Sequence, residues 1–397
     1  MKIGIYGGTF NPIHLGHMAA AKFAIEYLKL DKLYLVPVGI PPHKELAEGT
    51  PAPRHRQAMA ELAGQALGEH VEVLDLELRR QGKSYTTDTV RAIQKQHPKD
   101  HLYLLMGTDM FLTFQNWRHP EEIAKRCTLC AFGRSEADTE ALFAPQRAYL
   151  HEKYSADVVT IVLPEIVDIS STQLREKLCR GDGNQFLLPA VYGYILVHHL
   201  YGTRADLKHL PLELLRPAAL SLLDQRRVPH VLGTEETAAK LALRWGANEE
   251  DARRAALLHD CTKRLSRSEH LRLCKHYGIR VDEQERKAGG KLLHAKTGAA
   301  LARDLFGVSE EIGSAIYWHT TGKADMTLLE KIIYLADYIE PTRNFGALKE
   351  LRPLAYEDLD RAILRGLTIA VEDLSRKGMV LHPNSVRARD YLKGKLL

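Results

Sequence analysis

The sequence has little of what would mark a membrane, secreted or nucleic-acid-binding protein. None of its apolar runs approaches the roughly 20 residues of a membrane-spanning helix. It opens on a strand-like segment, with no charged and apolar leader. A net charge of +5 is too small to predict a nucleic-acid surface. We therefore expect a protein that binds neither membranes nor nucleic acids; a homo-oligomer is compatible with this composition.

Cysteine is also scarce, with five residues in the chain. An odd number without regular spacing does not predict a disulfide framework. Cys127 and Cys130 make a C-x-x-C pair, but they lie in an apolar run, 127–132, that predicts a buried strand. Residues three apart on a strand point to opposite faces, and no second pair is present to complete a zinc site. We expect reduced cysteines and a cytoplasmic protein.

Two common phosphate-binding fingerprints, G-x-G-x-x-G and G-x-x-x-x-G-K-[ST], are missing after the first strand-like run. That run leads instead into Gly7-Gly8-Thr9-Phe10-Asn11-Pro12-Ile13-His14-Leu15-Gly16-His17. The two glycines let the backbone approach a ligand, and Pro12 suits the first turn of a helix. His14 and His17 share one face of that helix, since they are three apart. Backbone donors, the helix dipole and two imidazoles together predict an anion site.

A chain of 397 residues predicts two domains. In residues 1–202, short apolar runs alternate with helical patterns, which predicts an α/β domain with a doubly wound parallel sheet. The expected strands are 2–6, 32–36, 71–74, 101–106, 127–132 and 158–163. A polar segment, 203–210, is the expected linker, and 211–397 is expected to be all-helical. Its clearest helical patterns are 234–245, 249–259, 294–306, 309–319 and 328–339.

Polar clusters come after the predicted strands, at the sheet edge where ligands bind in such folds. They are Pro41-Pro42-His43-Lys44, Ser84-Tyr85-Thr86-Thr87-Asp88-Thr89, Gly107-Thr108-Asp109, Asn116-Trp117, Arg134, and Ile169-Ser170-Ser171-Thr172-Gln173-Leu174-Arg175. Lys44 could reach a triphosphate, and Trp117 could stack on an aromatic ring. Taken alone, Pro41-Pro42-His43-Lys44 is more typical of a solvated turn and Trp117 of a packing residue, and 84–89 is also compatible with a helix cap.

The order of these clusters after the H-x-G-H motif resembles the nicotinate-nucleotide adenylyltransferase family, within the nucleotidyltransferase superfamily, over about residues 1–201. The resemblance implies adenylyl transfer from ATP, with Mg²⁺, to nicotinate mononucleotide, which gives deamido-NAD and pyrophosphate. It implies catalytic roles for His14, His17 and Lys44, and a nicotinate site at Thr86 and Trp117. The implied binding residues are Gly7, Gly8, Thr9, Phe10, Thr86, Gly107, Asp109, Trp117, Arg134, Ile169, Ser170, Ser171, Thr172 and Arg175.

Two alternatives exist for this half. An adenylyltransferase could use another acceptor, such as pantetheine phosphate or a pyridoxal-like ring, although Trp117 with 84–89 favours nicotinate. An aminoacyl-tRNA synthetase also carries H-x-G-H, but the sequence has no K-M-S-K-S partner for it.

The second half concentrates its chemistry in six residues, several of them in apolar helical patterns: His230, His259, Asp260, His294, His319 and Asp337. Burying such groups is costly unless they bind a metal. Imidazole and carboxylate ligands suit Zn²⁺, Fe or Mn²⁺. Six ligands exceed the need of one structural metal, so we expect two metal ions.

This H…HD…H…H…D order resembles the HD-domain metal phosphohydrolases over about residues 211–397. His319-Thr-Thr-Gly and Tyr334-Leu-Ala-Asp-Tyr-Ile-Glu-Pro-Thr-Arg343 are similar to the YqeK-type subfamily. The resemblance implies two iron ions bridged by Asp260, symmetrical hydrolysis of diadenosine tetraphosphate to two ADP, and a phosphate-binding role for Arg343. Alternatives are another nucleotide phosphatase, a non-catalytic nucleotide sensor, or a scaffold that joins two partner proteins.

Overall fold

The computed structural model describes residues 1–42, 45–133, 137–163 and 167–396. These residues form two compact units, Met1–Arg204 and Ala205–Leu397, which are described separately. Lys44 and Arg134, both expected at the first site, lie outside the described residues. In the described part of the chain, no helix combines the length and the apolar character needed to cross a membrane.

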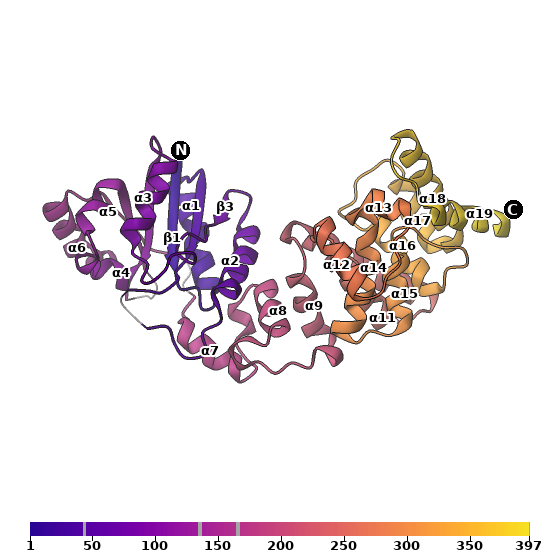
Figure 1. The fold of residues 1–397 in the computed structure, drawn as a ribbon, viewed down its shortest axis with the longest axis horizontal. Helices are drawn as coiled ribbons and strands as arrows, with labels where there is room; N and C mark the ends of the chain where they lie inside the picture. Colours follow the sequence, from indigo (N-terminus) through magenta and orange to yellow (C-terminus); the bar gives the residue numbers. More distant parts are fainter. Residues whose placement is uncertain (43–44, 134–136, 164–166, 397) are drawn as a thin grey trace. The chain divides into compact units, whose positions relative to one another are not determined.

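The first unit is built on a six-stranded parallel sheet of order β3-β2-β1-β4-β5-β6 (Figure 1). The strands are β1 Lys2–Gly8, β2 Lys32–Pro37, β3 Val71–Val73, β4 His101–Gly107, β5 Cys127–Phe132 and β6 Val158–Ile161. The predicted α/β class is confirmed. The strand order reverses between β1 and β4, so their carboxyl ends open a crevice there.

Helices and short turns connect these strands. The helices are α1 Leu15–Leu28, α2 Pro53–Leu67, α3 Thr86–Gln96, α4 Thr108–Leu112, α5 Pro120–Arg126, α6 Glu140–Tyr154, α7 Ser171–Cys179 and α8 Pro189–Val197. The 3₁₀ turns are η1 Phe114–Asn116, η2 Asn184–Phe186 and η3 Leu200–Gly202. α1, α4 and α7 begin at or next to three segments that were predicted to bind a ligand: 7–17, 107–109 and 169–175.

The cysteines are structural rather than reactive, with one exception. Burial in β5 raises the pKa of the Cys127 and Cys130 thiols to about 12, so both stay protonated. Cys261 and Cys274 are also buried, and Cys179 at the end of α7 is exposed. None of the five is in a disulfide.

The second unit is all-helical, as predicted (Figure 1). Its helices are α9 Leu212–Ser221, α10 Val228–Trp245, α11 Glu249–Leu258, α12 Arg267–His276, α13 Glu283–Ala288, α14 Gly290–Phe306, α15 Glu310–Trp318, α16 Leu328–Ile339, α17 Leu348–Glu357, α18 Leu359–Arg376 and α19 Pro383–Leu396, with 3₁₀ turns η4 Leu207–His209 and η5 Gln225–Arg227. α10 packs on α11 and α16.

Helix ends account for the difference between the expected and observed bounds. α16 begins where predicted, since Thr327 caps it and Glu330 completes the capping box. α10 begins at Val228, six residues before the predicted start at 234, because Pro229 supplies a favourable first turn. The longer α10 brings His230 onto its first turn.

Candidate functional site

The first candidate site lies where β1 passes into α1. Gly8 is required at this turn, because a Cβ there would lie 2.9 Å from the Phe10 ring. Phe10 has a positive φ of 45° and is buried, with its ring edge-on to Tyr6 and His17 at centroid distances of 5.7 and 5.3 Å. Phe10 therefore supports His17 from the core and lines neither of the two cavities of this site.

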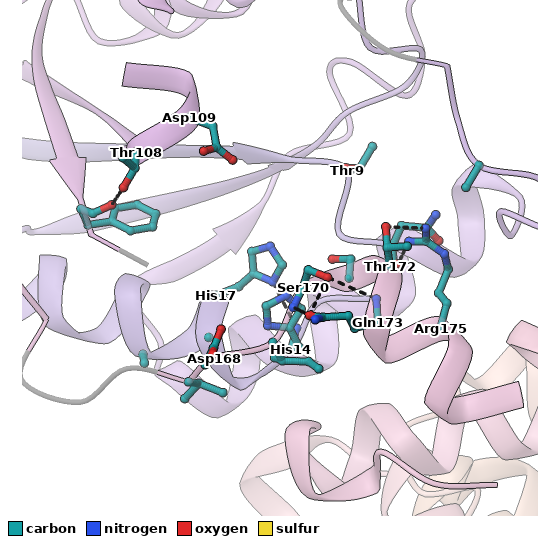
Figure 2. Close-up of a pocket in the computed structure, with 18 of the residues that line it drawn as sticks. Thr9, His14, His17, Thr108, Asp109, Asp168, Ser170, Thr172, Gln173 and Arg175 are labelled. Carbon is teal, nitrogen blue, oxygen red and sulfur yellow. Dashed lines mark hydrogen bonds between the residues drawn. The ribbon is translucent and has the colours of Figure 1, made fainter. Parts of the chain in front are cut away.

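A hydrogen bond at the start of α1 determines which ring nitrogen of His17 carries the proton. The backbone N–H of His14, the N-cap residue, donates to Nδ1 of His17 at 3.3 Å. Because Nδ1 accepts this bond, the neutral His17 ring carries its proton on Nε2. The His14 and His17 ring centroids are 3.8 Å apart, and both side chains line the same cavity (Figure 2).

This larger cavity has a volume of about 660 Å³ and lies between the start of α1 and the start of α7. Ser170 caps α7, since its Oγ accepts from the N–H of Gln173 at 3.2 Å. Arg175 donates to the Asn11 carbonyl at 2.9 Å and to Thr172 Oγ1 at 3.1 Å, which ties α7 to the loop after β1 (Figure 2). Two helix N-termini thus face one cavity, an arrangement that favours a polyanion.

A second, smaller cavity of about 280 Å³ adjoins the first. It lies over the ends of β1 and β4 and the start of α3, and Thr86 and Trp117 line it. Thr9, His17, Asp109 and Ser171 line both cavities. A ligand in one cavity can therefore meet a ligand in the other beside His17.

Most residues expected at the first site line these cavities. The larger one takes Thr9, His14, His17, Asp109, Ile169, Ser170, Ser171, Thr172 and Arg175, and the smaller one also takes Gly7, Gly8, Thr86 and Trp117. Gly107, the last residue of β4, lines neither.

Arg56 on α2 was missed by the sequence analysis. Its guanidinium is fully buried and donates to the carbonyls of Thr9, Val38 and Gly39 at 2.9, 2.6 and 3.3 Å. It joins the loop after β1 to the loop after β2. No sequence signal marks it, because a lone arginine in a helix is normally exposed.

The second candidate site lies in the helical unit, where all six expected ligands come together. His230 is on α10, His294 on α14 and Asp337 on α16, while His259-Asp260 and His319 come after the ends of α11 and α15. The four histidines and Asp260 are between 0 and 8% exposed. His230 Nε2 lies 3.2 Å from Asp337 Oδ1, and His294 Nε2 lies 3.2 Å from Asp260 Oδ1.

Hydrogen bonds orient all four imidazoles. Nδ1 of His259, His294 and His319 donates to a helix carbonyl at 2.6, 2.8 and 2.7 Å, and Nδ1 of His230 faces Glu340 Oε1 at 3.0 Å. In the neutral rings the Nε2 lone pairs therefore converge, at 3.3 Å between His230 and His259 and 3.1 Å between His294 and His319. Facing lone pairs repel unless a cation lies between them, so the donor set fits a metal centre.

Asp260 divides the ligands into two groups. Its Oδ2 lies 3.4 Å from His259 and 3.7 Å from His230, while its Oδ1 lies 3.2 Å from His294 and 3.9 Å from His319. Oδ1 has no hydrogen-bond partner among the described residues. His230-His259-Asp260 and Asp260-His294-His319 each offer three ligand atoms within 4.8 Å of one another. This geometry suits two cations that share one carboxylate.

The pKa shifts of four of the six ligands suit cation binding, whereas burial would lower the pKa of His259 but the adjacent Asp260 carboxylate raises it. Burial lowers the pKa of His294 and His319, which keeps both rings neutral. Burial alone would raise the pKa of the Asp260 and Asp337 carboxyls, but the adjacent imidazoles hold both pKa values below the usual range. The carboxylates are ionised and these two imidazoles are unprotonated, as metal ligands must be.

Three positively charged side chains surround this centre. Arg343 lies 2.5 Å from Asp337 Oδ1, Lys263 Nζ lies 2.9 Å from His294 Nε2, and Arg227 forms an ion pair with Asp260. Arg343 was predicted from the sequence, whereas Arg227 and Lys263 were not. Lys263 comes three residues after Asp260 in the turns that follow α11, and this proximity in sequence was an available signal.

Comparisons with known proteins match each unit separately. A family model described as cytidylyltransferase-like matches residues 5–177, and a model of the HD domain matches residues 227–342. A probable nicotinate-nucleotide adenylyltransferase from Carboxydothermus hydrogenoformans is 37% identical over 201 residues, which cover 50% of this chain and 98% of the relative. Its counterpart from Shouchella clausii is 39% identical over 202 residues, 51% of this chain and 97% of the relative.

A solved structure from Clostridium acetobutylicum is also similar. It is described as a predicted HD superfamily hydrolase involved in NAD metabolism. Its sequence is 37% identical and the match covers 47% of this chain and 98% of that one, with a TM-score of 0.45.

Proposed function

Because the amino-terminal half of the chain belongs to the nicotinate-nucleotide adenylyltransferase family and the second half contains an HD domain, we propose that the protein is a bifunctional enzyme of adenine-nucleotide chemistry. The first unit transfers the adenylyl group of ATP to nicotinate mononucleotide. The second unit hydrolyses a nucleotide polyphosphate with the help of metal ions.

The observation that carries the first activity is the pair of adjoining cavities with His17 between them. ATP occupies the larger cavity, where the starts of α1 and α7 face its phosphates. Nicotinate mononucleotide occupies the smaller one, with its ring against Trp117 and its carboxylate at Thr86. Mg²⁺ bound with ATP offsets part of the phosphate charge.

The acceptor's 5′-phosphate attacks the α-phosphorus of ATP, and the bond from that phosphorus to the bridging oxygen breaks to release pyrophosphate. The attacking phosphate is ionised near neutral pH, so no protein base is required. Catalysis then consists of alignment and stabilisation of charge on the α-phosphate oxygens. His17 donates to that charge through Nε2–H, and His14 lies beside it.

Acceptor choice tests this assignment. With ATP and Mg²⁺, we expect nicotinate mononucleotide to give deamido-NAD and pyrophosphate, measured by chromatography. Pantetheine phosphate and pyridoxal-like acceptors should give no adenylylated product. Turnover of one of these acceptors in place of nicotinate mononucleotide would contradict the proposal.

For the second unit we propose symmetrical hydrolysis of diadenosine tetraphosphate, in which one water adds across the central P–O–P bond to give two ADP. Two ions, which we expect to be iron although Mn²⁺ or Zn²⁺ would suit the same ligands, would be held by the two triads that share Asp260. When bound, such ions polarise phosphoryl oxygens and make water more acidic. Arg227, Lys263 and Arg343 neutralise the polyphosphate chain.

A nucleotide sensor would use the same ligands without turnover. Incubation of the metal-loaded full chain with diadenosine tetraphosphate separates the two functions. We expect ADP as the main product, whereas binding without any cleavage would favour the sensor.

Glu340 is proposed to orient His230 for metal binding. Its carboxylate is fully buried; Oε1 faces His230 Nδ1 at 3.0 Å, and Oε2 accepts from the backbone N–H of Thr342 at 2.6 Å. Gly233 leaves the space for it, because a Cβ at that position would lie 2.6 Å from Oε2. Carboxylates that hold a ligating histidine in this way typically matter 10- to 100-fold for metal affinity, by order of magnitude.

Gly233→Ala is therefore expected to weaken metal binding by about tenfold, because the new methyl group displaces the Glu340 carboxylate from His230. Titration calorimetry with Mn²⁺ measures the change. Gly394→Ala is the matched control, since it also lies within a helix of this unit and a Cβ there meets nothing within 4 Å. Equal Mn²⁺ affinities in the two variants would contradict the proposal that Glu340 orients His230 for metal binding.

A further inference from the structure

The smaller cavity of the first unit is poor in positive charge. Among its described lining residues, Arg118 is the only lysine or arginine, and two acidic side chains, Glu77 and Asp109, line the same cavity. Without Arg118, an acceptor with an anionic ring substituent would meet these acidic side chains and no described lysine or arginine in the lining. Arg80 also acts on Glu77 and lies near Thr89, but Arg118 is the described cation that lines the cavity itself.

The backbone of Arg118 is fixed beside the expected ring site. Arg118 is next to Trp117 in the chain, and its carbonyl accepts a hydrogen bond from Thr87 Oγ1 at the start of α3. Thr86, the preceding residue of α3, lines the same cavity. The side chain of Arg118 therefore starts from the edge of the cavity that also carries Thr86 and Trp117.

The guanidinium of Arg118 is exposed and available for a ligand. It lies over the ring of Tyr85, 4.6 Å from the centroid, and Tyr85 also lines the cavity. A guanidinium stacked on an aromatic face keeps the N–H groups along its edge free to donate. In the described part of the chain, no carboxylate forms an ion pair with it.

Glu77 indicates how the wall of this cavity affects a negative charge. Its side chain is 5% exposed, and Oε1 accepts from Thr89 Oγ1 at 2.6 Å. Burial raises the pKa of this carboxyl, which shows that its surroundings disfavour negative charge. A second carboxylate entering the cavity would face the same penalty, which hydrogen-bond donors at the start of α3 and a cation would both reduce.

We propose that Arg118 pairs with the carboxylate of the acceptor ring and so makes the cavity prefer nicotinate mononucleotide over nicotinamide mononucleotide. This inference rests on the proposed adenylyl transfer. The two acceptors have the same ribose phosphate and differ in the ring substituent, which is an anion in one and a neutral amide in the other. Arg118 contributes to substrate choice, while His14 and His17 serve the reaction with either acceptor.

Arg118→Gln tests the pairing, since glutamine keeps a polar side chain without the charge. We expect the ratio of kcat/KM for nicotinate mononucleotide to kcat/KM for nicotinamide mononucleotide to fall about tenfold, mainly through the KM of the nicotinate substrate. The KM for ATP should not change. Arg118→Lys keeps the charge and should retain most of the preference.

Arg79→Gln is the matched control, because Arg79 is on the same unit, is 78% exposed and lines neither cavity. It should leave the acceptor ratio at the wild-type value. Added salt screens an exposed charge pair, so raising the KCl concentration should lower the acceptor ratio of the wild type and leave that of Arg118→Gln unchanged.

The acceptor ratios distinguish failure of the Arg118 inference from failure of the proposed adenylyl transfer. An unchanged ratio in Arg118→Gln overturns the inference while the adenylyl-transfer proposal stands. A loss shared equally by both acceptors and by ATP affinity also overturns it, because it shows a structural role. A wild-type chain that adenylylates neither mononucleotide overturns the proposed function and this inference together.

Discussion

His17→Ala is expected to lower kcat for adenylyl transfer by about 10²- to 10³-fold, with little change in the KM for ATP. The Nδ1 atom of His17 accepts the His14 N–H, so the neutral ring carries its donor, the N–H, at Nε2. Charge on the α-phosphate oxygens rises in the transition state, so a donor aimed at them acts on kcat more than on binding. Steady-state kinetics with varied ATP separate the two effects.

Two further variants serve as controls for the His17→Ala result. His151→Ala removes an exposed imidazole from α6, outside both cavities, and should retain wild-type kcat. His17→Gln keeps an N–H donor and should recover part of the rate. Equal loss of kcat and ATP affinity in His17→Ala would mean that His17 only binds the nucleotide.

The second large effect is expected from the double variant His259→Ala/Asp260→Ala. Asp260 is the carboxylate that both triads share, and His259 is a ligand in one of them. We expect bound metal and diadenosine tetraphosphate hydrolysis to be lost together, while adenylyl transfer, which belongs to the other compact unit, continues at the wild-type rate. Elemental analysis and the two assays on the same preparation measure these three quantities.

This variant also leaves Arg227 and Lys263 without their carboxylate, and breaking a buried pair typically costs about 3–5 kcal/mol of stability. Asp337→Asn, at a partly exposed ligand that Arg343 also reaches, is therefore a second test with less risk to the fold. Asp304→Asn, at an exposed carboxylate bonded to Tyr277, is the control. Full metal content in Asp337→Asn and in the double variant would exclude the proposed centre.

The sequence predicts most of the fold because its signals are local. All six strands of the first unit are short apolar runs, and their positions are confirmed with end shifts of two residues at most; β5 matches its predicted range. The six second-site residues could be identified because each has a distinctive side chain in a recognisable order. The sequence predicted that these residues come together. The distances from the two Asp260 oxygens add that they form two triads that share this carboxylate.

Contacts between distant segments could not be predicted. Glu340 meets His230 across 110 positions of sequence, and the space it needs depends on a glycine that looks unremarkable in α10. Phe10 was expected to bind ligand, but its positive φ turns the ring into the core under His17. Such outcomes depend on packing, which no local pattern encodes.

The exposure of Cys179 gives an experimental handle on the first unit. The other four cysteines are buried, so a thiol-reactive fluorophore should attach to native protein at this position alone. Cys179 ends α7, the helix whose beginning lines the larger cavity. A dye placed there would report nucleotide occupancy as a change in emission, without a radioactive substrate or a mutation.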